Sequence, residues 1–180
     1  MEGAHFVKTG KLIKLSEQQC LDCATKNGCS GAYQSDCFEY AEGTNMETEE
    51  EYPYSSYAST CWDSYDGPVK VNSYKNVAHN SQDQLLAAIA NGPVSVTIDA
   101  GGYVFQHYIK GIIEDISCGT GLDHAVTAVG YGDENGSKYY IVKNSWGADW
   151  GENGYVRIGM NGDGTGICGI QEMSLFPDTN

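Results

Sequence analysis

Two residues in the C-terminal half of the chain have the types and the spacing of a catalytic pair. His124 begins a β-prone stretch that reaches Tyr131, and Asn144 follows a second such stretch, residues 139–142. The intervening Asn135-Gly136 is typical of a tight hairpin turn. Because a hairpin brings the far ends of its strands together, we expect His124 and Asn144 to be neighbours. An amide oxygen beside an imidazole fixes the tautomer of the ring and turns its other nitrogen toward a nucleophile.

Trp146 follows Asn144 by two residues and is placed to shield that hydrogen bond from water. The remaining histidines, His5, His79 and His107, lie in helical or loop contexts without such a partner. We interpret them as surface or packing residues.

Several elements must hold this pair in place. We expect a first helix at residues 1–9 that ends at Gly10, and a second that starts after Ser16, with Gln19 completing a capping box. A third helix is expected at 32–41, ended by Gly43. A fourth would begin at the capping residues 81–84 and stop at 91–93. Strands are expected at 94–98 and 111–113, and an irregular crossover at 62–71. Tyrosine and glycine are abundant, which favours β-structure with tight turns.

Two stretches carry a resemblance to a known family. Residues 121–132, GLDHAVTAVGYG, and residues 143–155, KNSWGADWGENGY, resemble the papain family of cysteine proteases, the cathepsin L-like branch in particular. Residues 1–10, MEGAHFVKTG, and the strings LSEQ and YPY are similar to the family too. The resemblance implies an α+β, papain-like two-lobe fold. A helical lobe, incomplete at its N-terminus, would span 1–68, and an antiparallel, β-barrel-like lobe would span 69–180 and carry His124 and Asn144.

The resemblance also implies a cysteine-type endopeptidase that acts through Cys, His and Asn. In this family the nucleophilic cysteine precedes the histidine by about 130–150 residues, so it would lie before residue 1. We therefore expect the chain to be present without its nucleophile segment and to be inactive alone. The alternative is a pseudo-protease that serves as a structural or peptide-binding module.

A set of substrate-binding residues follows from the same resemblance. The pocket for the second residue upstream of the cleaved bond would have an uncharged, apolar lining and prefer Leu, Val or Phe. Ala32 stands where the family has the second glycine of a pair that binds substrate backbone. The implied substrate-binding residues are Gly31, Ala32, Tyr33, Thr97, Leu122, Asp123, Ala125, Trp150 and Met173.

Seven cysteines in 180 residues indicate an oxidising compartment. By resemblance, Cys23 pairs with Cys61 and Cys118 pairs with Cys168, whereas Cys29 pairs with a cysteine of the missing segment.

Cys20 and Cys37 have no counterpart in the family. They could form an additional disulfide, and Cys20 could instead be a buried thiol. The alternative is a zinc site formed by Cys20, Cys23, Cys29 and Cys37.

The charge narrows the range of partners. A net charge of −14 argues against nucleic acid and anionic membrane surfaces. No apolar run approaches the roughly 18 residues of a membrane span. We expect polypeptide substrates or a peptide-like inhibitor as partners, together with a separate N-terminal fragment or partner chain that covers the truncated lobe. No cofactor is expected. The seven cysteines fit a lysosomal, vacuolar or extracellular localisation. The glycosylation sequon Asn135-Gly136-Ser137 fits the same localisation.

Overall fold

The computed structural model describes residues 1–64 and 66–180. Position 65 falls inside the predicted crossover at 62–71, so that part of the prediction lies outside the described residues. The chain forms two compact units, one made of Met1–Lys75 with Pro177–Asn180 and the other of Asn76–Phe176. Residues 69–75 and Pro177–Asn180, which the sequence assigns to the second lobe, group with the first unit.

The first unit begins with the expected helices. Helix α1 (Glu2–Thr9) ends at Gly10, whose φ of 73° is left-handed, as predicted. Helix α2 (Glu17–Gln19) starts after Ser16 and continues as the π-helix η1 (Cys20–Ala24). The Ser16 hydroxyl accepts the Gln19 N–H at 2.9 Å. The reciprocal half of the predicted capping box is wrong: the buried Gln19 side chain instead accepts the Glu47 N–H.

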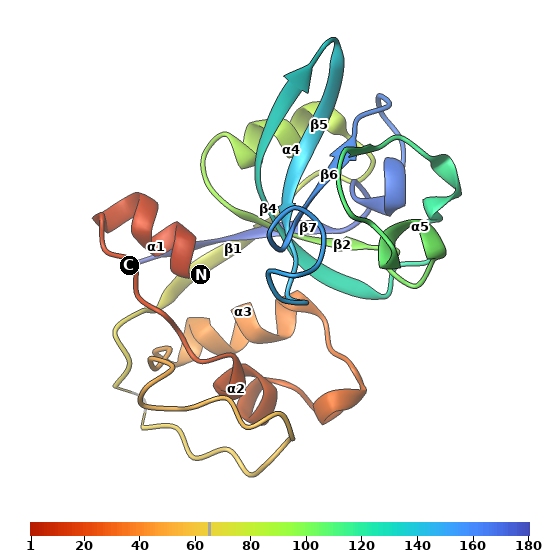
Figure 1. Ribbon diagram of the computed structural model, residues 1–180. Helices are drawn as coiled ribbons and strands as arrows, with labels where there is room; N and C mark the ends of the chain where they lie inside the picture. The colour runs from red at the N-terminus through yellow and green to blue at the C-terminus, as the bar shows by residue number, and fades with distance from the viewer. Residues whose placement is uncertain (65) are drawn as a thin grey trace. The chain divides into compact units, whose positions relative to one another are not determined.

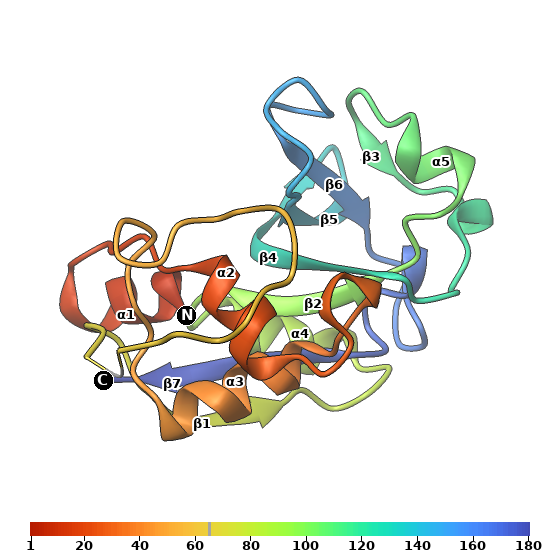
Figure 2. The same cartoon turned by 90° about the horizontal axis from the view of Figure 1, so that it is seen from below.

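The third helix is displaced from its prediction. After the 3₁₀-helix η2 (Gly28–Ser30), helix α3 spans Gln34–Gly43 and not 32–41. It starts later because Tyr33 is extended and its N–H donates to Asp36, three residues on. Figure 2 shows α3 beside the α2–η1 segment. The buried core of this unit is formed by Leu15, Ala41, Met46, Val69 and Val71, the last at the start of strand β1 (Val71–Asn76).

The second unit begins with a helix and a strand that match their predictions. Helix α4 (Gln82–Ile89) is capped by the Ser81 hydroxyl and buries Leu85 and Ile89. Strand β2 (Val94–Ile98) alternates buried and half-buried residues, as expected of a strand with one face on a core. The short elements that follow are α5 (Tyr103–Gln106), β3 (Ile112–Ile113) and η3 (Ile116–Cys118); η4 (Ile167–Gly169) comes near the end of the chain.

The predicted hairpin is present and longer than expected. Strands β4 (His124–Glu134) and β5 (Ser137–Lys143) pair from Glu134 opposite Ser137 to Thr127 opposite Lys143, with a bulge between Ala128 and Gly130. Asn135 and Gly136 both have positive φ, 56° and 92°, as a two-residue type I′ turn requires. Strand β6 (Tyr155–Gly159) pairs antiparallel with β5.

The strands form one open sheet in the order β1-β7-β2-β4-β5-β6-β3. Strand β7 (Ser174–Thr179) pairs with β2 through its first residues, and β3 pairs with β6 in parallel. The expected antiparallel, barrel-like lobe is thus mostly antiparallel but not closed. Its apolar core gathers residues from β2, β4, β5 and β6: Val94, Val96, Ile98, Val126, Ala128, Tyr140, Val142, Val156 and Ile158.

Within the described residues, no helix is long and apolar enough to cross a bilayer.

Candidate active site

The hairpin places His124 and Asn144 side by side. His124 is the first residue of β4 and pairs with Ile98 at the end of β2. Asn144 follows the last residue of β5. His124 Nε2 lies 2.9 Å from Asn144 Oδ1, at hydrogen-bonding distance. The neighbourhood predicted from the hairpin is therefore present.

The surroundings of Asn144 determine which way its amide points. Asn144 is buried, and its Oδ1 also accepts the backbone N–H of Ser145 at 2.8 Å. An atom that accepts a backbone N–H must be the oxygen, so His124 Nε2 carries the hydrogen that it shares. In the neutral ring the lone pair is then on Nδ1. Asn144 Nδ2 is buried without a hydrogen-bond partner in the described part of the chain.

Trp146 lies against the imidazole. The ring centroids of Trp146 and His124 are 5.2 Å apart with the planes tilted by 31°. Trp146 also contacts Trp150 and Phe105 edge to face. It keeps 42% of its surface exposed, so its role as a shield stays a prediction.

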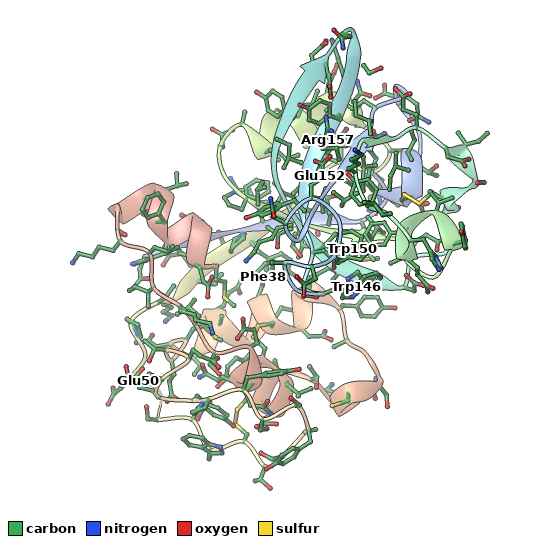
Figure 3. All side chains as sticks on the ribbon, in the orientation of Figure 1. Phe38, Glu50, Trp146, Trp150, Glu152 and Arg157 are labelled. Atoms are coloured by element: carbon green, nitrogen blue, oxygen red, sulfur yellow. A yellow bond between two sulfur atoms is a disulfide. The ribbon has the colours of Figure 1, made fainter. Side chains whose placement is uncertain are left out.

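Glu152 holds the loop that carries Trp146 and Trp150, and no pattern in the sequence singled it out. Its carboxylate accepts two guanidinium N–H groups of Arg157, at 2.8 and 3.0 Å, and the Gly111 N–H at 2.8 Å. Arg157 also pairs with Glu134. The charge pairing lowers the pKa of Glu152 and raises that of Arg157. Figure 3 labels Trp146, Trp150, Glu152 and Arg157, which come from this loop and from β6.

Two aspartates support the start of β4. Asp123 Oδ1 accepts the Ala100 N–H, and Asp99 Oδ2 accepts the Gly121 N–H, both at 2.8 Å. Asp123 was expected from the resemblance to bind substrate, and here its carboxylate bonds backbone. Asp99 was missed, because a single aspartate after a strand carries no distinguishing signal.

Three of the predicted substrate-binding residues lie together in the second unit. Thr97 pairs with Ala125 across β2 and β4, and its N–H donates to the Met173 carbonyl at 2.9 Å. Leu122 lies nearby in sequence and packs over Gly169, where an added Cβ would come within 2.7 Å of its Cδ2. Trp150 is half-buried against Phe105. Their binding of substrate stays a prediction.

The other predicted binding residues belong to the first unit. Gly31 follows η2 with φ 104° and ψ 153°, and Tyr33 precedes α3. Gly31, Ala32 and Tyr33 are exposed. Gly31 has open space where a Cβ would stand.

The disulfides expected from the resemblance are present. Cys23 pairs with Cys61 and Cys118 with Cys168.

Cys20 and Cys37 form the additional disulfide that was one of the states predicted for them. Because Cys20, Cys23 and Cys37 are all paired, the thiolate zinc site is excluded as an interpretation of these residues. Cys29 is free and exposed.

Comparison with known proteins identifies the family. Residues 1–178 match the model of the papain family of cysteine proteases. The chain belongs to this family. It is 45% identical to papaya proteinase 4 of Carica papaya over 184 residues, covering 100% of this chain and 53% of that protein. It is 43% identical to chymopapain of the same plant, covering 98% and 51%.

Solved structures agree with the fold. The bromelain protease from Ananas comosus superposes with a TM-score of 0.93 at 41% identity, covering 98% of this chain and 83% of that chain. A Carica candamarcensis cysteine protease gives 0.91 at 39% identity, covering 98% and 82%. The chain spans about half the length of the curated relatives that it matches.

Proposed function

We propose that this chain carries the histidine and the asparagine of a cysteine endopeptidase whose nucleophilic thiolate comes from outside these 180 residues. The observation that carries the proposal is the 2.9 Å contact between His124 Nε2 and Asn144 Oδ1. It leaves Nδ1 as the nitrogen that exchanges a proton with the thiol.

The chemistry follows from that geometry. The thiolate attacks the peptide carbonyl, and the protonated His124 gives its Nδ1 proton to the leaving amine. Water then hydrolyses the acyl-enzyme, with the imidazole as base. Asn144 keeps the ring in the tautomer that serves both steps. No cofactor is needed for these steps.

Substrate preference is proposed from the residues beside β2. Thr97, Ala125 and Met173 present no charged group, and Leu122 adds an apolar side chain, so the lining suits Leu, Val or Phe. They would receive the residue two positions upstream of the cleaved bond. A peptide library with Leu or Arg at that position tests this: stronger cleavage of the peptides that carry Arg there would contradict it.

By itself the chain is proposed to be inactive. Within residues 1–64 and 66–180, six of the seven cysteines are in disulfides, and only Cys29 has a free thiol. Cys29 lies in η2, and the resemblance assigns it a structural disulfide rather than the nucleophile. The same observation favours the second candidate function, an inactive scaffold that binds peptides. Three disulfides support a lysosomal, vacuolar or extracellular location.

The deciding experiment is the intact mass of native material before and after reduction. A species heavier than 19.5 kDa that releases a smaller peptide on reduction supports the endopeptidase, provided that an active-site thiol probe labels the peptide. A mass of 19.5 kDa in both conditions, without cleavage of a Leu-containing peptide, supports the scaffold.

A pair of variants ties any activity to the site. His124→Ala should abolish cleavage. His79→Ala, at an exposed position, should leave it unchanged. In material that carries the thiol-bearing peptide and cleaves substrate, equal activity of both variants would contradict the proposed role of His124.

A further inference from the structure

We propose that Asn135, at the tip of the β4–β5 hairpin, is a site of N-linked glycosylation. This goes beyond the proposed function and does not depend on it. Asn135-Gly136-Ser137 has the acceptor pattern of asparagine, any residue but proline, and serine or threonine. No other asparagine of the sequence is followed two positions later by serine or threonine.

The hairpin presents the acceptor amide to solvent. Asn135 is exposed, and its side chain makes no hydrogen bond within the described residues. The turn is held by other groups, because the Gly136 N–H donates to Asp133 Oδ1 at 2.8 Å. Modification of the Asn135 amide therefore removes no interaction that the fold uses.

The chain contains its own comparison for this site. Asn153 is exposed, has φ 55° and precedes Gly154 with φ 88°, so it shares the local backbone of Asn135-Gly136. The residue after Gly154 is Tyr155, which has a phenol where the pattern needs an aliphatic hydroxyl. If exposure and turn geometry were sufficient, both asparagines would be glycosylated. The acceptor pattern is met only at Asn135.

The reaction is a glycosyl transfer from a lipid-linked diphospho-oligosaccharide. Asn135 Nδ2 forms a bond with the anomeric carbon of the sugar, and the bond from that carbon to the phosphate oxygen breaks. The lipid diphosphate leaves, and the amide nitrogen loses one proton. The three disulfides indicate folding in an oxidising compartment, which is where secreted proteins meet such donors.

The position of the site separates it from the candidate catalytic pair. His124 and Glu134 are the two ends of β4, about 30 Å apart at the usual rise per residue of a strand. Figure 1 shows the hairpin tip projecting at the top of the view, at the end of β4–β5 away from β2. An oligosaccharide at Asn135 would cover the outer end of the hairpin, where Tyr131 is 50% exposed, and leave His124 accessible.

The test is a mass measurement on the 180-residue chain produced through the secretory route of eukaryotic cells. We expect a species heavier than 19.5 kDa that an N-glycan-removing amidase returns to the mass of the polypeptide, leaving Asp at position 135 in the peptide map. Asn153 should stay unmodified.

Two variants at one position complete the test. Ser137→Ala should lose the oligosaccharide, and Ser137→Thr should keep it, while both retain the three disulfides. An unmodified Asn135 in both the wild-type chain and the folded Ser137→Thr variant would overturn the proposal. Because no readout involves peptide cleavage, this failure would leave the proposed function untouched.

Discussion

Asn144 controls His124 through a single oxygen atom. Its Oδ1 accepts the N–H of Ser145 and also lies 2.9 Å from His124 Nε2. Since the backbone N–H cannot reverse its role, the amide cannot flip without losing this part-buried hydrogen bond. The tautomer of His124 is thus determined by a peptide group that is not itself reactive.

The first prediction concerns that tautomer. In Asn144→Ala the neutral His124 ring should lose its preference for the Nε2–H form, because nothing then accepts that hydrogen. The imidazole ¹⁵N chemical shifts of the chain, recorded at a pH where the ring is neutral, measure the two forms. Ser145→Ala keeps the backbone N–H and should keep the wild-type shifts. Unchanged shifts in Asn144→Ala would show that another group fixes the ring.

At this scale the sequence predicts the pair but not its surroundings. His124 and Asn144 could be placed together because the hairpin that joins them is local, with Asn135-Gly136 requiring the positive φ values seen. The buried state of Asn144 and its bond to Ser145 depend on how the following loop folds back. The predicted capping box of Gln19 is wrong for the same reason, because the Gln19 side chain accepts the N–H of Glu47, which is distant in sequence.

The element that positions the site is the loop from Asn144 to Gly154. The Asn144 N–H donates to the Gly154 carbonyl at 2.9 Å, which closes the loop. Glu152 then ties it to the residue before β3 and to β6, through Gly111 and Arg157. Sequence could not reveal this role, since β3 and β6 pair in parallel and no local pattern joins them.

The second prediction concerns Glu152. Glu152→Gln should lower the free energy of unfolding by about 2 kcal/mol at neutral pH, because charged hydrogen bonds to Arg157 are lost. Pairing with Arg157 lowers the pKa of Glu152. Its stabilisation is therefore present above the carboxyl's unfolded pKa and is lost as the pH falls through the lowered, folded pKa. Chemical denaturation at neutral and acidic pH measures both effects.

Glu134 provides the matched control for that variant. It pairs with the same guanidinium, but its side chain is 53% exposed, against 29% for Glu152. Glu134→Gln should therefore cost less than about 1 kcal/mol. If both variants lowered the free energy of unfolding equally, Glu152 would not stabilise the loop more than Glu134 does.

Across the whole molecule, the carboxylates respond to acid in opposite directions. Glu152, in the second unit, has a lowered pKa and loses its contribution in acid. Glu17, in the first unit, has a raised pKa, chiefly because it is partly removed from water, and the nearby charges of Glu49 and Glu2 act in the same direction. Protonation of Glu17 thus favours folding in a chain whose net charge is −14.

The third prediction follows from Glu17. A carboxyl whose pKa is higher in the folded than in the unfolded chain contributes stability that is fully present below the unfolded pKa. That contribution is lost as the pH rises through the folded pKa. Glu49→Gln removes the neighbouring charge, and its new amide can donate to Glu17. The variant should therefore have a higher Tm than the wild type at pH 7, and the difference should shrink as the pH falls and Glu17 becomes protonated in both. Glu50→Gln serves as the control, because it removes one negative charge at the next residue in sequence. Glu50 is exposed and is labelled in Figure 3. If Glu50→Gln raised the Tm at pH 7 as much as Glu49→Gln did, the effect would belong to net charge and not to the contact between Glu17 and Glu49.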